Sequence, residues 1–231
     1  MTNNEDCPFY NSCNHIDCNK PYCTRRIKID ALYDLALIPK ARRKHIKLVL
    51  DINLTDEQEF CKLVDIERNI VKFVNSGQSL YIHSSIAGNG KTSWSIRLLT
   101  AYLKSVWLTT PTDECKALFV NVPSYLLGIK SAITKPNEEI EMIKDNILQA
   151  DIVVFDDIGT KVATSFEHEN LLSIIDTRIN NGKCNIFTSN LNDDELHEAL
   201  GDRLASRICS TPNNIELKGK DKRGISQDEI K

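Results

Sequence analysis

The chain has 231 residues, 41% of them hydrophobic and 26% charged, a composition that suits a globular protein with one α/β core and a small appendage. A formal net charge of −3 excludes a globally basic nucleic-acid-binding protein, so any contact with DNA must come from local basic patches. No apolar run reaches transmembrane length, and the polar, acidic start is unlike a signal peptide. We therefore expect a cytoplasmic protein with no membrane partner.

The first feature along the chain is a cluster of four of its eight cysteines, Cys7, Cys13, Cys18 and Cys23. In a reducing compartment, clustered cysteines serve a metal more often than disulfides. The spacing predicts one Zn²⁺ held by these thiolates, with His15 as a substitute ligand, and the ion would supply folding energy that so short a segment lacks. Free thiols in a disordered head are the alternative.

A linker and two helices are expected next. Residues 27–37 predict a short amphipathic helix, and a basic run covers residues 40–47 after Pro39. The run could contact the phosphates of single-stranded DNA, but the lack of an interleaved aromatic residue slightly favours a solvated linker face. Residues 55–76 then predict one longer helix, which Thr55 caps and Gly77 ends.

The stretch Ser84-Ser-Ile-Ala-Gly-Asn-Gly-Lys-Thr-Ser93 follows an apolar run and precedes a helical pattern, which is the context of a phosphate-binding loop. Its glycines let backbone N–H groups point at phosphate oxygens, aided by the positive end of the following helix. Lys91 would neutralise the β- and γ-phosphates, and the Thr92 hydroxyl would coordinate Mg²⁺. A Gly-rich turn with a surface lysine is the alternative for the motif taken alone. The residues predicted to bind nucleotide are Ser85, which replaces the usual first glycine, Gly88, Asn89, Gly90, Lys91, Thr92 and Ser93.

Two carboxylates follow a uniformly apolar strand that ends near residue 155, after an earlier strand at 117–121 and a helix opened by Pro123. In open α/β sheets, ligands bind beyond the carboxyl ends of the strands. Asp156 is the candidate Mg²⁺ partner, through water, and Asp157 is the candidate base that orients the attacking water. A turn or helix cap is the alternative, which the upstream phosphate-binding loop disfavours.

The remaining elements complete an expected parallel sheet flanked by helices, which is the α/β fold class. Residues 166–181 predict a helix that packs on the sheet, and residues 184–190 predict a strand. Asn190 would project from this strand toward the γ-phosphate, or alternatively begin a turn. Arg203 and Arg207 lie four residues apart and so share one face of a helix.

The order of these motifs resembles one family, the AAA+ ATPases of the DnaC/DnaI helicase-loader type, with IstB as a transposition relative. The resemblance covers residues 80–223 and rests on the phosphate-binding loop, Asp156-Asp157-Ile-Gly, Ile174-Ile-Asp-Thr-Arg178, Thr188-Ser-Asn190 and Gly201-Asp-Arg. It implies that Asn190 is sensor 1, which positions the hydrolytic water. It also implies that Arg207 is an arginine finger that completes the active site of the next subunit. Arg223 would be a sensor-2-like residue, unless it only belongs to a basic tail.

The resemblance implies an ATP-dependent loader that delivers a replicative hexameric helicase onto DNA during replication initiation. ATP, Mg²⁺ and Zn²⁺ would be its cofactors, and it would self-associate and contact single-stranded DNA. Tyr125 and Lys130 are candidate DNA contacts, with core packing and solvent exposure as their alternatives. Residues 1–50 would form a Cys-rich partner-binding segment with a basic linker, and residues 51–231 the AAA+ ATPase domain.

Two other functions stay open at this point. An IstB-like transposition helper is one, although the Cys-rich start favours the loader because the IstB architecture has no such metal-binding head. A nucleotide-gated adaptor with little turnover is the other. A phage or a cell could equally encode a loader of this size.

Overall fold

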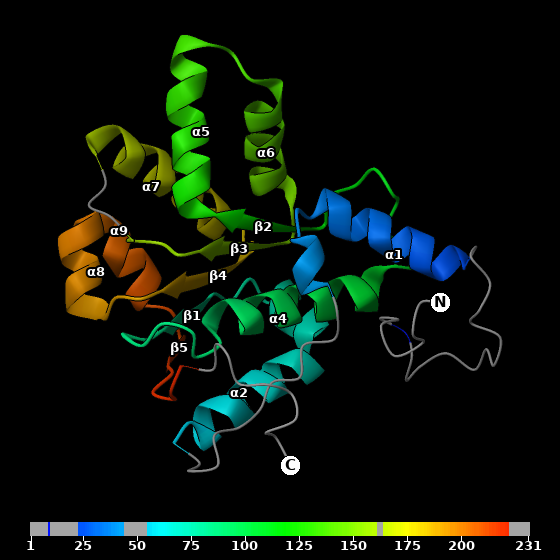
Figure 1. The fold of residues 1–231 in the computed structure, drawn as a ribbon, viewed down its shortest axis with the longest axis horizontal. Coiled ribbons are helices and arrows are strands. Elements are labelled where there is room, and N and C mark those ends of the chain that lie inside the picture. The colour runs from blue at the N-terminus through cyan, green and yellow to red at the C-terminus, as the bar shows by residue number, and fades with distance from the viewer. Residues whose placement is uncertain (1–8, 10–22, 44–54, 161–163, 222–231) are drawn as a thin grey trace.

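The computed structural model of the chain describes residues 9, 23–43, 55–160 and 164–221 (Figure 1). Helices alternate with parallel strands through most of this part. The elements are α1 (Thr24–Leu35), a 3₁₀ turn (Lys40–Arg42), α2 (Glu57–Arg68), α3 (Ile70–Asn75), β1 (Leu80–His83), α4 (Lys91–Val106), β2 (Ala117–Asn121), α5 (Val122–Thr134), α6 (Glu138–Gln149), β3 (Ile152–Asp156), α7 (Ser165–Asn180), β4 (Cys184–Ser189), α8 (Asp193–Leu200), α9 (Asp202–Cys209) and β5 (Asn213–Glu216).

The described strands form one parallel sheet in the order β2-β3-β4-β1-β5. Strand β4 lies between β1 and β3, with Tyr81 and Phe155 both opposite Phe187. All strands run in the same direction, so their carboxyl ends meet at one edge. This arrangement places the ends of β1, β3 and β4 beside one another, and it confirms the predicted fold class.

Alternate side chains along each strand enter two separate hydrophobic cores, because successive residues of a strand point to opposite faces. Leu80, Ile82 and Val154 pack under α1, α2, α3 and α4. Tyr81 and Phe155 pack under the remaining helices, α5 to α9, on the other face. Figure 1 shows α5 and α6 on one side of the sheet and α4 and α2 on the other. Burial on both faces explains why β3 is apolar from Ile152 to Phe155.

The first helix belongs to this core. Ile29, Leu32 and Tyr33 of α1 are buried against the α4 side of the sheet. Just after the helix, the carbonyl oxygen of Ala36 accepts a hydrogen bond of 2.8 Å from the backbone N–H of Phe119 in the edge strand β2. Helix α1, which lies in the predicted N-terminal segment of residues 1–50, is thus attached to the sheet. The domain boundary at residue 50 stays a prediction.

Two helix predictions are wrong in their limits. The helix expected over 55–76 breaks at Asn69, whose side-chain amide donates to the carbonyl oxygen of Asp65 at 3.0 Å and competes with helical continuation. Its N-cap is Asp56 and not Thr55. The helix expected over 27–37 begins at Thr24 and ends at Leu35, and Leu37 has a left-handed φ of 55°. None of the described helices is long and apolar enough to cross a membrane.

A buried arginine joins the elements at the amino ends of the strands, which we call the amino edge of the sheet. Arg178 of α7 is fully buried, and its guanidinium donates to the Cys184 carbonyl and the Asn185 side chain at 2.6 Å each. It also donates to the Ala150 carbonyl at 2.8 Å and to the Ile147 carbonyl. Burial lowers the pKa of Arg178 to about 10. The cost of burying this charge is offset by four hydrogen bonds that tie α7 to α6, to the α6–β3 junction and to β4.

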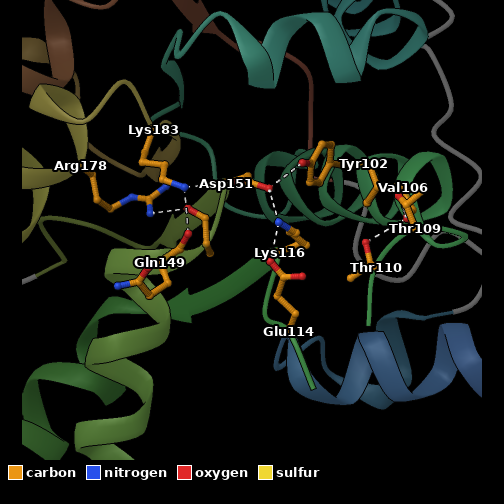
Figure 2. A network of polar contacts seen from close by, with 11 residues as sticks. Tyr102, Val106, Thr109, Thr110, Glu114, Lys116, Gln149, Asp151, Arg178 and Lys183 are labelled. Atoms are coloured by element: carbon orange, nitrogen blue, oxygen red, sulfur yellow. Dashed lines mark hydrogen bonds and ion pairs between the residues drawn. The ribbon is translucent and has the colours of Figure 1, made fainter. Parts of the chain in front are cut away.

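Charged side chains surround Asp151 at the same edge. Figure 2 shows Tyr102, Lys116 and Lys183 converging on this carboxylate. Tyr102 and Lys183 donate to it at 3.0 Å each, and the Lys116 ammonium lies 3.7 Å away. Burial alone would raise the pKa of Asp151, but these three neighbours outweigh it and lower the pKa. The amino edge is therefore electrostatically satisfied within the chain.

Candidate nucleotide site

The phosphate-binding loop connects β1 to α4 at the carboxyl edge of the sheet. Gly88 and Gly90 have φ angles of 78° and 112°, a region that glycine enters without steric cost. Gly90 is also the N-cap of α4 and has no side chain to cap the first N–H groups of that helix, which leaves them available to a ligand. Ser85 has no positive φ, which explains why a serine fits where a first glycine is usual.

Lys91 lies inside this loop. Its side chain is buried, and the ammonium donates to the carbonyl oxygens of Ile86 at 2.9 Å and of Ser84 at 3.2 Å. The Asn89 side chain contacts the same ammonium at 3.4 Å. Asn89 in turn donates to the Ser84 hydroxyl at 2.6 Å. The loop thus holds a cation at its centre beside the first turn of a helix, which is an arrangement suited to an anionic ligand.

Asp156 ends β3 and is buried next to the start of α4. Its carboxylate accepts a hydrogen bond of 2.7 Å from Thr188 on β4, and the Thr92 hydroxyl also bonds to it. Burial raises the pKa of Asp156, with a smaller contribution from neighbouring Asp157, while the two hydroxyl groups oppose the rise. A carboxylate and a hydroxyl beside a phosphate-binding loop are the oxygen ligands that Mg²⁺ takes in such sites. These residues therefore fit a magnesium ion.

Asp157 follows in a strained conformation. Its φ of 59° is left-handed, which a non-glycine residue adopts at a cost of about 1–3 kcal/mol. Its N–H donates to the Thr188 hydroxyl at 3.0 Å. The half-buried side chain lines a small pocket with Val122, Leu126 and Leu171, on the α5 side of the sheet. Strain at the end of a strand beside a ligand loop is typical of a functional residue.

Two more polar residues lie at the carboxyl edge of the sheet or at the start of α4. Asn190 directly follows β4 and is exposed. Arg42, which the sequence placed in the basic run, donates from its guanidinium to the Ser93 hydroxyl at 3.3 Å. Its positive charge also favours the ionised form of Asp156. The 44–47 part of that run lies outside the described residues.

The two candidate DNA contacts on α5, Tyr125 and Lys130, both pack against or pair with other parts of the chain. Tyr125 is buried with only 4% of its surface exposed, so core packing is the correct reading and a DNA contact through this side chain is wrong. Lys130 is 43% exposed and pairs with the buried carboxylate of Glu167 at 3.2 Å. That carboxylate also accepts from the backbone N–H of Thr164 in the capping box that begins α7. Lys130 therefore links α5 to α7.

The two arginines of α9 share one partner. The Arg207 guanidinium donates to Asp176 of α7 at 2.8 Å, and Arg203 lies 3.9 Å from the same carboxylate. Arg207 is about half exposed and Arg203 is more exposed. Asp176 thus orients the Arg207 guanidinium at the surface of the chain.

Several predicted ligands lie outside the described residues, namely Cys7, Cys13, His15, Cys18 and Arg223. Cys23 is described, directly precedes α1 and forms no disulfide. Within the described ranges, no three His, Cys, Asp or Glu side chains come together as a metal site. The zinc site stays a prediction.

Sequence reasoning missed the residues that lock the site together. Thr188 joins the Asp156 side chain to the Asp157 backbone. The signal that could have identified it is its place near the carboxyl end of the strand predicted over 184–190, where its side chain can reach the end of the neighbouring strand. Asp56 was also missed, because its partners, the backbone N–H groups of Lys218 and Gly219, are more than 160 residues away.

No protein-family model and no curated protein matches the chain. Among solved structures, it is similar to the DnaC helicase loader, with a TM-score of 0.62, 19% identity, and coverage of 78% of this chain and 100% of that one. It is similar to DnaI, with a TM-score of 0.59, 18% identity, and coverage of 79% and 92%. A further similarity is to the replication initiator DnaA bound to AMPPCP and single-stranded DNA, with a TM-score of 0.55, 16% identity, and coverage of 71% and 47%.

These similarities define the fold. The chain shares its parallel, helix-flanked α/β sheet with the DnaC helicase loader and the DnaA initiator. At 16–19% identity the likeness concerns architecture and does not by itself assign an activity.

Proposed function

We propose that this protein is an AAA+ ATPase that loads a replicative hexameric helicase onto DNA. One observation carries the ATPase part: the Lys91 loop, the Thr92 hydroxyl and the buried Asp156 carboxylate meet at the carboxyl edge of one parallel sheet. A bound Mg²⁺ would polarise the phosphates of ATP. The loader part is supported by the shared fold with the DnaC helicase loader and DnaI.

Each residue of the site has a proposed role. Lys91 and the loop backbone, including Ser85, Gly88, Asn89, Gly90 and Ser93, bind the phosphates, and Arg223 adds a contact from the C-terminal segment. Thr92 and Asp156 hold Mg²⁺. Asp157 orients and deprotonates the attacking water, and Asn190 positions that water from the end of β4.

Arg207 is proposed to act on the nucleotide of a neighbouring copy. Its side chain is half exposed and is held by Asp176 at the surface of α9, where a second subunit can receive it. A guanidinium placed against the triphosphate of the next subunit stabilises charge that develops during transfer. This role would make hydrolysis depend on self-association.

The remaining assignments concern partners. We propose that residues 1–50 carry a Zn²⁺ bound by Cys7, Cys13, Cys18 and Cys23, with His15 as a substitute, and contact the helicase. Single-stranded DNA would be a second partner, and the protein would act in the cytoplasm. An IstB-like transposition helper has the same motifs, and a nucleotide-gated adaptor would differ only in its lack of turnover.

The first experiment tests nucleotide binding. Lys91→Ala removes the cation of the loop, so the affinity for Mg²⁺-ATP measured by calorimetry should fall at least tenfold. Lys72→Ala, on the exposed side of α3, removes the same charge and should change nothing. Equal affinities for wild type and Lys91→Ala would overturn the site.

The second experiment tests the base. Asp157→Asn keeps the size of the side chain but removes its proton acceptor, so turnover should fall by about 10²–10⁴-fold while ATP still binds. An undetectable turnover of the wild type, with and without single-stranded DNA, would favour the adaptor.

Mixing two inactive variants tests the neighbour role. Assemblies of Arg207→Ala with Asp157→Asn contain some interfaces in which both residues are intact, so partial activity should return. If the variants co-assemble and remain inactive, Arg207 acts within its own chain. Arg203→Ala serves as the matched control and should keep most of the activity.

The loader is distinguished from the transposition helper by its partner. A purified replicative helicase should be retained by the immobilised chain in an ATP-dependent manner. Replacing Cys18 and Cys23 by Ser should remove one equivalent of zinc, measured by elemental analysis, and weaken this retention. Retention of a transposase instead of the helicase would support the IstB-like alternative.

A further inference from the structure

The backbone that follows β5 crosses the phosphate-binding loop. We name residues 217–221 the strap. The N–H of Leu217 donates to the His83 carbonyl at the end of β1 at 2.9 Å. The carbonyl of Leu217 accepts from the side chain of Asn89, in the loop, at 3.0 Å. The strap is therefore bonded on one side to the strand that leads into the loop and on the other to the loop itself.

A buried carboxylate anchors the middle of the strap. Asp56, just before α2, accepts hydrogen bonds of 2.7 Å from the N–H groups of both Lys218 and Gly219. A side chain at Gly219 would place its Cβ only 2.6 Å from the Asp56 carboxylate, so a glycine is needed there. Two charge-assisted bonds and a close backbone approach define the position of the strap.

The last residue of the strap contacts the loop directly. A Cβ added to Gly88 would lie 1.8 Å from one carboxylate oxygen of Asp221 and 2.9 Å from the other. The Asp221 carboxylate thus packs against the α-carbon of Gly88, one residue from Asn89 and two from Gly90. An acidic group is in contact with a loop whose other charged group, Lys91, is suited to phosphate.

This contact has an electrostatic consequence. Phosphates bound by the loop would be close to Asp221, because its carboxylate packs on Gly88 of that loop, and like charges at short range repel appreciably at a protein surface. The Asn89 side chain adds a mechanical link, because it contacts both the Lys91 ammonium and the strap. A shift of the ammonium toward phosphate would remove one of the contacts that orient the Asn89 side chain, which also bonds to Leu217.

We propose that Asp221 lowers the affinity of the site for nucleotide, and that nucleotide in turn weakens the docking of the strap on the loop. The proposal rests on the proposed ATPase function and concerns the regulation of the same site. Because coupling between two binding events is reciprocal, the factor by which the docked strap weakens nucleotide binding equals the factor by which nucleotide weakens strap docking. The strap would thereby transmit occupancy of the site to the C-terminal residues that follow it, and Arg223 would contact the nucleotide from the undocked segment.

The affinity for AMPPCP, a non-hydrolysable ATP analogue, tests the first half of this proposal. In calorimetry on the full chain with Mg²⁺, Asp221→Asn should bind it about three- to tenfold more tightly than wild type, less so at high salt. The matched control is Glu216→Gln, which removes a half-exposed carboxylate that pairs with Lys218 on the same segment. Its affinity should stay within twofold of wild type. Unchanged or weaker binding by Asp221→Asn would overturn the proposal.

Hydrogen exchange tests the second half. The N–H groups of Lys218 and Gly219 report docking of the strap through their bonds to Asp56, and they should exchange several-fold faster when AMPPCP is bound. Equal or slower exchange would contradict the coupling. If wild type and all variants fail to bind AMPPCP, the proposed ATPase function fails as well. If wild type binds it through Lys91 and Asp221→Asn matches wild type, only the present proposal fails.

Discussion

Strand β3 carries a carboxylate at each end, and the two differ in how the chain treats them. Asp151, directly before the strand, is surrounded by Lys183, Lys116 and Tyr102, which lower its pKa despite burial (Figure 2). Asp156, the last residue of the strand, has a pKa raised by burial, and its hydrogen bonds come from the hydroxyl groups of Thr188 and Thr92. The first carboxylate stabilises the fold, whereas the second retains an electrostatic cost that a bound cation would offset.

The buried cations at the two edges repeat this contrast. Arg178 donates to four acceptors that belong to α6, the α6–β3 junction and β4, so it joins fixed parts of the fold. Lys91 donates to carbonyl oxygens of a single glycine-containing loop. A flexible ammonium on loop carbonyls can turn toward a ligand, while a guanidinium fixed by several elements cannot. The contacts at the amino edge suit stability, and those at the carboxyl edge suit the proposed binding of a ligand.

The largest expected effect lies at the amino edge. Arg178→Met removes the guanidinium and leaves three buried carbonyl groups without their donor, so the free energy of unfolding should fall by about 3–5 kcal/mol. Urea denaturation measures this change. Arg178→Lys should recover only part of the loss, because one ammonium cannot replace the planar fork. Arg68→Met, at an exposed position of α2, should change stability by less than about 0.5 kcal/mol. A small effect at Arg178 would break the contrast between the edges.

The next effect belongs to Asp156 and separates binding from stability. Because its folded-state pKa lies above the unfolded value, ionisation of Asp156 costs folding free energy as the pH rises through that interval. Asp156→Asn removes this cost, so stability without ligand at neutral pH should be equal or higher. The same change should weaken Mg²⁺-dependent ATP binding about tenfold or more, which is about 1.4 kcal/mol or more. Thermal unfolding with and without Mg²⁺-ATP tests both parts. A large loss of stability without ligand would show that Asp156 is a structural residue like Asp151.

The sequence predicted the central strands well, for a physical reason. Buried parallel strands must be apolar on both faces, and this makes 152–155 and the neighbouring runs easy to recognise. Strand β5 was not predicted, because Asn213-Asn-Ile-Glu216 buries one side chain and reads as a turn. The break at Asn69 was also missed, since the apolar pattern continues through it while a single side-chain bond ends the helix.

Residues of the candidate site could be predicted where they are close in sequence to the elements that position them. Contacts between residues far apart in the sequence could not be predicted. The loop glycines, Lys91 and the Asp156-Asp157 pair are adjacent in sequence to the elements that position them. The bonds of Asp56 to the strap, and of Arg207 to Asp176, join residues far apart in the chain, and no periodicity marks them. Those contacts form only once the sheet has brought its helices together.

The smallest expected effect on stability is that of Tyr102→Phe. The pH dependence of this effect tests the contrast between Asp151 and Asp156 most directly. Tyr102→Phe keeps the buried ring but removes the hydroxyl that donates to Asp151, so unfolding free energy at neutral pH should fall by about 1–2 kcal/mol. Since the folded-state pKa of Asp151 is below its unfolded value, its stabilising contribution is present above the unfolded pKa and is lost as the pH falls through the folded one. Part of the depression of that pKa comes from Tyr102, so the deficit of the variant should be largest near neutral pH and shrink in acid.

Tyr125→Phe is the matched control for this prediction. Among the described residues, the Tyr125 hydroxyl is buried without a hydrogen-bond partner, so its removal should leave stability unchanged or slightly higher at every pH. Chemical denaturation of both variants from pH 7 down to pH 3 makes the test. A deficit for Tyr102→Phe that stays constant across this range would mean that its hydroxyl serves packing and not the charge of Asp151. In that case the lowered pKa of Asp151 would depend on Lys183 and Lys116, and the contrast between Asp151 and Asp156 would rest on salt bridges that added salt should weaken.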